Sequence, residues 1–430
     1  MNMPPDIVIK YLQKYSVKEW KIENIGNRKF DNVIVVPAIC EYENIRRLIN
    51  SLLQNDEKYL YCTLLLIVLN NLPSSKEEIK IENLRTMDYL RTINSEKINI
   101  HFVDASSPGK ELPENHGGVG LARKIGMDLA LTVFDYSSAS KKILICTDAD
   151  CTVEKNYLQE ITSAFNKRDL SAAVVNYRHD ISGEDENTAA IICYEYYLRY
   201  YVLGLKYANS PYAFHTIGST MVCDYKSYIK AEGMNKRKAA EDFYFLEKLA
   251  KVTAIENISS TTVHPSARAS WRVPFGTGQR VNRFLSKERD EYKLYSPEVF
   301  EILKSWLTTL NKNSNLVSDY LSDAERIHPE LYKFLIQQEF DRAFSKILNH
   351  ANDEKQLNLQ KKLWFDGFRT LKLIHHLRDN GFPEINTFDA IDLLFEKMKI
   401  SCDIKRDKGA IPELSVQKKY LESLRELDRN

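Results

Sequence analysis

Two aspartates close one of the apolar runs of the chain, in the segment Ile143-Leu144-Ile145-Cys146-Thr147-Asp148-Ala149-Asp150. Carboxylates two residues apart at the end of a buried strand can reach a common point just beyond the sheet. Hard divalent cations such as Mg²⁺ or Mn²⁺ prefer oxygen ligands and are often shared between carboxylates and a substrate diphosphate. The same spacing also marks solvated turns and helix caps, so the position at a strand end is what favours a cation site.

A glycine-rich segment with a fixed cation precedes these acids, in Gly117-Gly118-Val119-Gly120-Leu121-Ala122-Arg123. A glycine-rich turn that opens a helix presents free N–H groups and the positive end of the helix dipole to an anion. Alternatively, the glycines only shape a loop, and Gly126 allows the helix to pack closely. The segment matches neither the Rossmann fingerprint nor a P-loop.

A second acidic pair, Glu241-Asp242, follows the basic segment 236–238 and precedes an amphipathic helical pattern. Acids at a helix N-terminus are ordinarily caps that the dipole stabilises. One of the two could instead be a general base that takes a proton from a substrate hydroxyl.

The elements that would position these residues alternate between strand and helix. Apolar runs end at Pro37, Asn70, Asp104 and Asp148, and helical periodicity lies between them over 45–53, 78–95 and 119–134. This alternation predicts an α/β fold with a mostly parallel sheet and helices on both faces. The loops beyond the carboxyl ends of such strands carry function, so polar side chains from distant segments should meet at one edge.

The periodicity becomes purely helical toward the C-terminus, over 296–311, 328–352, 355–379, 387–400 and 412–427. We therefore predict an α/β catalytic domain over residues 1–284, with a helical lead-in over 1–30, and a helical C-terminal domain over 285–430. The tyrosine-rich stretch 194–207 is interpreted as one face of a packed helix.

Composition excludes several classes of protein. The 430 residues are 43% hydrophobic and carry 60 Lys and Arg against 59 Asp and Glu. A net charge of +1 supplies no field to hold a polyanion, so nucleic acid is not an expected partner. The seven cysteines show no metal-ligand spacing, and no signal peptide or transmembrane run is evident, which predicts a cytoplasmic protein.

Taken together, the order of these motifs resembles the nucleotide-sugar-dependent glycosyltransferases of family 2, which have the GT-A fold. The resemblance covers residues 31–280. It rests on five features in order: Val33–Ala38 with Glu41, Glu43, Asn44 and Ile45; Gly118–Gly126; Asp148 and Asp150; Gly218-Ser219-Thr220; and Glu241-Asp242. The implied fold is a Rossmann-like GT-A domain.

The resemblance also implies a role for each matched residue on the donor side. Pro37, Ala38 and Glu41 would line the nucleotide pocket, and Arg123 would lie near the nucleotide. Asp148 would face the ribose or the metal, and Asp150 would ligate a divalent cation, Mn²⁺ or Mg²⁺. Asn70 and Asp104, which end the second and third strands, are counted among the residues that bind the nucleotide sugar.

On the reaction side, Asp242 would be the base, with Glu241 beside it. His264 would be a further metal ligand, or else an ordinary packing histidine. Arg268 and Arg272 would neutralise the leaving diphosphate from a loop that closes over it. Enzymes of this family are usually inverting.

Two departures from the family pattern qualify this hypothesis. Asn70-Asn71 stands where the family usually has acids, so the nucleotide, UDP or GDP, stays open. No Gln-x-x-Arg-Trp motif follows the acidic pair, which argues against a processive synthase. The expected acceptor is an unidentified glycan or small molecule, and a homodimer is left open. The alternatives are a non-catalytic nucleotide-sugar or glycan-binding protein, and a nucleotidyltransferase.

Overall fold

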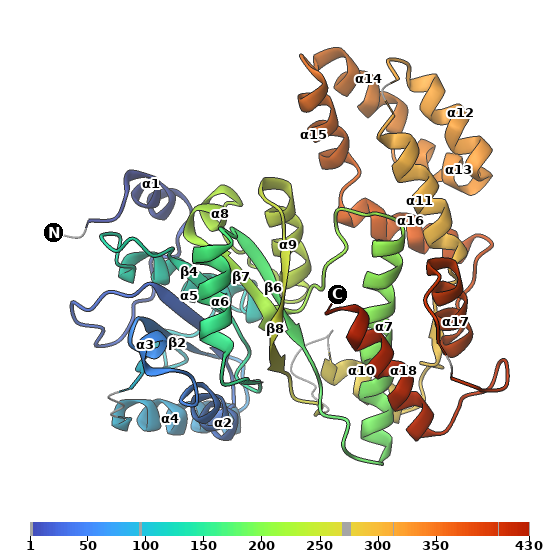
Figure 1. Ribbon diagram of the computed structural model, residues 1–430. Coiled ribbons are helices and arrows are strands. Elements are labelled where there is room, and N and C mark those ends of the chain that lie inside the picture. The colour runs from blue at the N-terminus through green and yellow to red at the C-terminus, as the bar shows by residue number, and fades with distance from the viewer. Residues whose placement is uncertain (1–2, 94–96, 269–276, 313, 403, 430) are drawn as a thin grey trace. The chain divides into compact units, whose positions relative to one another are not determined.

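The computed structural model describes residues 3–93, 97–268, 277–312, 314–402 and 404–429 (Figure 1). The chain divides into two compact units. The first comprises Met1–Asp180, Thr216–Asn282 and Arg429–Asn430, and the second comprises Ile181–His215 and Arg283–Asp428.

An eight-stranded sheet forms the centre of the first unit, in the order β3-β2-β1-β4-β7-β6-β8-β5. Its strands are β1 (Asn32–Ala38), β2 (Thr63–Asn70), β3 (Asn99–Ala105), β4 (Ile143–Cys146), β5 (Thr152–Val153), β6 (Ala172–Tyr177), β7 (Met221–Asp224) and β8 (Glu256–His264). The pairs β1·β2, β1·β4, β2·β3 and β6·β8 are parallel, and the pairs that join β7 and β5 to the sheet are antiparallel. The predicted α/β fold is confirmed, and the sheet is consistent with a GT-A-like domain.

Helices cover both faces of this sheet because the strands are apolar on both sides. On one face, Ile34 and Val36 of β1 pack with α2 (Tyr42–Leu52) and α6 (Tyr157–Lys167) in one buried cluster. On the other face lies α5 (Val119–Val133), where a Cβ on Gly126 would come within 2.4 Å of Val35 Cγ1. Gly126 therefore allows close packing of α5 on the sheet, as one of the two sequence interpretations predicts.

The remaining helical elements of this part of the chain precede the sheet, join its strands or follow its last strand. They are α1 (Asp6–Tyr15), α3 (Glu57–Tyr61), α4 (Glu77–Thr92), η1 (Gly218–Thr220), α8 (Tyr225–Lys230), α9 (Glu241–Val252) and α10 (Thr277–Leu285).

The carboxyl ends of four parallel strands meet at one edge of the sheet, as predicted. In β1 and β2, Ala38 pairs with Leu69, and in β2 and β3, Asn70 pairs with Ala105. β4 runs parallel to β1 up to Cys146, so Asp148 follows at the same edge. Candidate residues that are far apart in the sequence therefore lie at the same edge of the sheet.

The second unit is helical. It contains α7 (Glu186–Tyr207), α11 (Glu298–Leu310), α12 (Val317–Ile327), α13 (Pro329–Gln337), α14 (Phe340–His350), α15 (Glu354–Trp364), α16 (Gly367–Asp379), α17 (Thr387–Met398) and α18 (Leu414–Leu427), with a small sheet of β9 (Lys293–Leu294) and β10 (Ile385–Asn386). The helical C-terminal region predicted from the sequence is confirmed.

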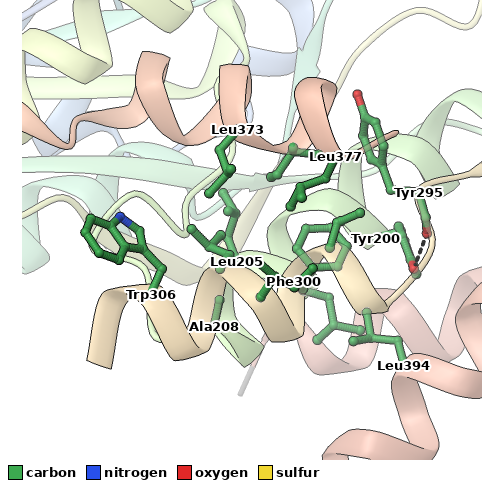
Figure 2. Packing of buried hydrophobic residues seen from close by; sticks show 14 of the residues in the cluster. Tyr200, Leu205, Ala208, Tyr295, Phe300, Trp306, Leu373, Leu377 and Leu394 are labelled. Atoms are coloured by element: carbon green, nitrogen blue, oxygen red, sulfur yellow. Dashed lines mark hydrogen bonds between the residues drawn. The ribbon is translucent and has the colours of Figure 1, made fainter. Parts of the chain in front are cut away.

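Aromatic and aliphatic side chains together fill the core of this second unit (Figure 2). Trp306 and Phe300 of α11 are fully buried, and the Tyr200 hydroxyl donates a hydrogen bond to the Tyr295 carbonyl at 2.6 Å. Tyr196 and Tyr200 are also fully buried on α7, which confirms that the tyrosine-rich stretch is a packed helix face. None of the described helices in either unit has the length and apolar character needed to cross a membrane.

Candidate active site

Asp148 and Asp150 lie in the turn that follows β4. Each offers a carboxylate oxygen within 4.8 Å of the other, and the Cys151 thiol completes the group. Among the described residues no other group of three or more acidic, His or Cys side chains could hold a metal ion in this way. Two hard oxygen ligands suit Mg²⁺ or Mn²⁺. Cys151, which is 1% exposed, was not expected from the sequence, and its position directly after the motif is the only signal that could have indicated it.

Arg123 connects three segments of this site. Its Nη2 donates to Asp148 Oδ1 at 2.6 Å, its Nε to Glu241 Oε1 at 3.3 Å, and its Nη1 to the Gly218 carbonyl at 3.2 Å. A Cβ on Gly218 would come within 2.4 Å of Nη2, so only glycine allows this approach. Arg123 is 2% exposed, and the carboxylates hold its pKa above the ordinary value although burial opposes the charge. Among the described residues, Arg123 therefore pairs with one carboxylate from each of the two acidic motifs.

The acidic pair starts α9, where the chain turns sharply. Ala240 has a φ of 56° in the left-handed region, directly before Glu241. The Asn235 side chain donates to the Glu241 carbonyl at 2.8 Å, and Asp242 accepts the backbone N–H of Phe243 at 2.7 Å. These contacts fix the entry into the helix, and they leave the two carboxylates in its first turn.

The glycine-rich start of α5 packs directly on the segment before α9. A Cβ on Gly120 would lie 2.3 Å from the Arg237 carbonyl oxygen, and one on Gly118 would lie 3.0 Å from Lys238 Cα. The small residues thus let two backbones approach each other. The expectation that this turn binds an anion remains a prediction.

Burial and mutual repulsion perturb the acids of the site. Burial raises the pKa of Glu241 to about 7, with Arg123 opposing the rise and Asp242 adding to it. Burial also raises the pKa of Asp148 to about 6, against the effect of Arg123 and together with the charges of Asp150, Asp242 and Glu41. The pKa of Asp242 is raised by burial as well, although Arg123 and the N–H groups of Phe243 and Gly218 oppose the rise. Acids with raised pKa values in a charged cluster are typical of functional sites.

Arg268 is the second cation of the site. One of its nitrogens, Nη2, contacts Glu41 Oε1 and lies 3.1 Å from Asp150 Oδ2. Glu41, at the start of α2, is 8% exposed and also accepts a hydrogen bond from Asn44 at 2.5 Å. The structure thus brings the predicted residues Glu41, Asp150 and Arg268 together. Arg272 lies outside the described residues.

His264 ends β8, where it pairs with Thr152 of β5. Its Nε2 lies 2.8 Å from Glu154 Oε1, and its Nδ1 lies 3.2 Å from the Arg178 carbonyl oxygen. It is not part of the group formed by Asp148, Asp150 and Cys151. Its role as a metal ligand stays a prediction that would require the ring to exchange Glu154 for the ion.

Asparagine side chains tie the ends of β1 and β2 together. The Asn70 amide donates to the Ala38 carbonyl at 3.0 Å, and Asn83 of α4 donates to the Asn70 carbonyl at 3.1 Å and to Asn71 Oδ1 at 2.9 Å. Asn83 also accepts the N–H of Cys40, the residue that follows β1 by two positions. Asn83 was not expected from the sequence, because nothing in its helical segment distinguishes it from a solvated residue. The network gives the loop after β1, which starts at Pro37 and Ala38, a fixed shape.

Asp104 at the end of β3 organises its own loop. It accepts the N–H of Ser107 at 2.9 Å and that of Ser106 at 3.2 Å, and Lys110 Nζ lies 3.0 Å from its other oxygen. These bonds hold its pKa below the ordinary value although burial raises it. Its predicted contact with the nucleotide sugar is not tested by these bonds.

Comparisons with known proteins find similarity only among solved structures. No family model matches the chain, and neither does any curated protein. TarS of S. aureus, residues 1–349 in complex with UDP-GlcNAc, aligns at 13% identity over 88% of this chain and 95% of its own, with a TM-score of 0.38. The mannosyltransferase PcManGT from Pyrobaculum calidifontis, in complex with GDP-Man and Mn²⁺, aligns at 11% identity over 87% of this chain and 95% of its own, with a TM-score of 0.36. Because these values are low, the site described above rests on the geometry of this chain alone.

Proposed function

We propose that the chain is a metal-dependent glycosyltransferase that moves a single sugar from a nucleotide-sugar donor to a hydroxyl acceptor. The observation that carries the proposal is the gathering of charges of both signs at one sheet edge. Five carboxylates meet two guanidinium groups there: Glu41, Asp148, Asp150, Glu241 and Asp242 with Arg123 and Arg268. A site of this kind can hold a diphosphate through a cation and also supply a base.

The excess of negative charge supports a divalent cation. Among the described residues the site has five acids and two arginines, and the oxygen ligands of Asp148 and Asp150 fit Mn²⁺ or Mg²⁺. We assign the cation to these two residues, with His264 as the proposed further ligand. When bound, such an ion would stabilise negative charge on the departing nucleoside diphosphate.

Asp242 is the proposed base. The Glu241 carboxylate forms an ion pair with Arg123. Asp242 has no ion-pair partner of its own among the described contacts, so it is the member of the pair that could accept a proton from the acceptor. In the proposed step the acceptor oxygen bonds to the anomeric carbon while its proton passes to Asp242. The bond from that carbon to the diphosphate oxygen breaks, and Arg268 helps to neutralise the leaving group.

The donor would be a UDP- or GDP-sugar. Its nucleotide would lie at the loops after β1, β2 and β3, against Pro37, Ala38, Glu41, Asn70 and Asp104. Arg123 would act near the nucleotide through Asp148, and Arg272 stays a predicted diphosphate ligand. Asn70 and Asp104 place polar groups at these strand ends, where each is 6% exposed and hydrogen-bonded within the protein.

The finer assignments complete the proposal. Transfer would be inverting, non-processive and hexosyltransferase-like, to a glycan or small-molecule acceptor. Catalysis would reside in residues 1–284, and residues 285–430 would shape the acceptor side, bind a partner or mediate a homodimer. A cytoplasmic location is part of the same proposal.

A donor panel tests this function. The full chain is incubated with UDP- and GDP-sugars and Mn²⁺, and the release of nucleoside diphosphate is followed. We expect slow hydrolysis of one donor even without acceptor, and its loss in Asp150→Asn. The matched control is Asp169→Asn, which removes an exposed carboxylate paired with Lys141 in the same unit. If no donor is turned over, or if Asp150→Asn is as active as the control, the proposal is wrong. Donor binding without turnover, unchanged in Asp242→Asn, would instead indicate a binding protein.

A further inference from the structure

The guanidinium of Arg268 contacts Asp150, one of the two proposed ligands of the divalent cation. A single nitrogen, Nη2, contacts carboxylate oxygens of both Asp150 and Glu41. One positive centre between two anionic oxygens is the arrangement that a metal ion adopts between carboxylate ligands. Arg268 therefore supplies to Asp150 the charge that the proposed divalent cation would also supply.

We propose that Arg268 and the divalent cation are alternative partners of Asp150. The proposal rests on the cation site of the proposed function. Without metal, the guanidinium holds Asp150 and Glu41 together. An entering ion takes Asp150, and the displaced guanidinium becomes available to the anionic donor. The metal would thus bind before the donor. In the metal-free protein, Arg268 would supply the positive charge that balances Asp150 and Glu41.

The contrast between the two arginines supports this exchange. Each group of Arg123, Nε, Nη1 and Nη2, donates to a separate partner, and its side chain is only 3% exposed. Arg268 has a side chain that is 33% exposed, and its Nε has no hydrogen-bond partner among the described residues. A guanidinium that is one-third exposed, and whose buried Nε has no partner among the described residues in its present position, can leave its partners at lower cost than a fully buried one with three partners. Arg123 is the fixed cation of the site, and Arg268 is the exchangeable one.

The expected effect has a definite sign. When a binding site is free in only a fraction of the molecules, the apparent affinity for its ligand is reduced by that fraction. Removal of Arg268 frees Asp150 permanently and also removes a positive charge that repels the incoming ion. Both effects tighten metal binding, and for a partly exposed pair that bridges two acids we expect a gain of about five- to tenfold in Mn²⁺ affinity.

Mn²⁺ titration of the full chain, without donor, tests the exchange by the electron paramagnetic resonance signal of the free ion. The wild type is compared with Arg268→Gln and Arg268→Ser, and with Lys58→Gln, which removes one exposed positive charge paired with Asp56 in the same unit. We expect both Arg268 variants to bind Mn²⁺ about five- to tenfold more tightly than the wild type and the control. A gain in Arg268→Gln that Arg268→Ser lacks would mean that the new amide ligates the ion, and it would overturn the proposal.

A second comparison shows whether the gain passes through Asp150. In an Asp150→Asn background, Arg268→Gln should raise Mn²⁺ affinity clearly less than it does with Asp150 present, because the shared partner is absent and only the loss of the repelling charge remains. A full gain in that background would overturn the exchange. If the wild type binds Mn²⁺ and the Arg268 variants bind it equally or more weakly, the exchange is wrong and the proposed function stands. If neither the wild type nor any variant binds Mn²⁺, the cation site of the proposed function is itself wrong.

Discussion

Replacement of Arg123 by methionine removes the cation that lies between the two acidic motifs. Methionine keeps an unbranched apolar stem and lacks only the guanidinium end, so the packing of α5 around that stem is largely retained. Removal of one partner from a buried ion pair ordinarily costs about 3–5 kcal/mol, because the other charge stays buried without compensation. Here the acids have an alternative, since both can take up a proton.

The free-energy cost of protonating the two acids follows from their pKa values. Glu241 has a pKa of about 7, so it can be neutralised at pH 7 at a cost below about 1 kcal/mol. Asp148, with a pKa of about 6, would cost about 1.4 kcal/mol, and its 36% exposed side chain reduces this figure through solvent screening. We therefore expect Arg123→Met to lose only about 1–2 kcal/mol of unfolding free energy at pH 7.

The pH dependence of stability separates the ion-pair contribution of Arg123 from its packing contribution. Because the folded-state pKa values lie above the ordinary ones, the folded protein binds protons more tightly than the unfolded chain, and stability falls as pH rises between the two values. In the wild type this fall ends near pH 7, at the folded-state pKa of Glu241. Without Arg123 the folded-state pKa rises further, so the fall continues to higher pH. The loss of unfolding free energy caused by Arg123→Met should be small at pH 5. At pH 9, two units above the pKa of Glu241, protonating this acid costs about 3 kcal/mol, and the loss should approach that value.

Urea denaturation in metal-free buffer at pH 5, 7 and 9 measures this loss. Arg123→Lys is the matched control, since it keeps a positive charge and should recover most of the pH-dependent part. An equal loss at all three pH values would show that Arg123 stabilises the site by packing alone. That result would refute the assignment of Arg123 as the bridge between the two acidic motifs.

Two further predictions concern the same helix. Lys124→Met should destabilise the first unit by about 3 kcal/mol, because it leaves the Asp128 carboxylate, 1% exposed and 2.9 Å from Lys124 Nζ, with two tyrosine hydroxyls as its remaining partners among the described residues; an unchanged urea midpoint would contradict this. Gly126→Ala should cost about 1–3 kcal/mol, since the new Cβ would lie 2.4 Å from Val35 Cγ1, and hydrogen exchange in β1 should accelerate; unaltered exchange would show that α5 moves away without cost.

Strands β1, β2 and β4 could be predicted because each contains an uninterrupted run of apolar residues. β1 and β2 are buried along almost their whole length, so each reads as a continuous β-branched or leucine-rich run. β7 has only four residues and directly follows the short helix η1, and its pairing with β4 spans more than 70 residues of sequence. The apolar part of β7, Met221-Val222-Cys223, contains only one β-branched residue, so no local pattern distinguishes this strand from a loop.

Helix boundaries in the second unit show the same limit. The pattern over 328–352 predicts one helix, but the chain forms α13 and α14, separated at Glu339 with a φ of 53°. α12 was not predicted, since only Tyr320 and Ala324 of its residues are buried and its apolar face is narrow. A residue in the left-handed region leaves no signal when it is not glycine or asparagine.

The acids of the site could be predicted because they follow strands or start a helix, where function concentrates in α/β proteins. The partners of Arg123 could not. Arg123 and Glu241 are 118 residues apart, and the fit of Gly218 against the guanidinium depends on the packing of η1 on α5. Such contacts arise from tertiary structure and have no period or spacing in the sequence.

The proposed base is tested most directly by one rate. With the donor identified by the panel, nucleoside diphosphate release is measured at saturating donor and Mn²⁺ for the wild type and Asp242→Asn. Loss of a general base should lower this rate by about 10²–10⁴-fold while donor affinity stays within about twofold. A rate in Asp242→Asn within threefold of the wild type would contradict the catalytic role of Asp242 and, with it, the glycosyl transfer proposed for this site.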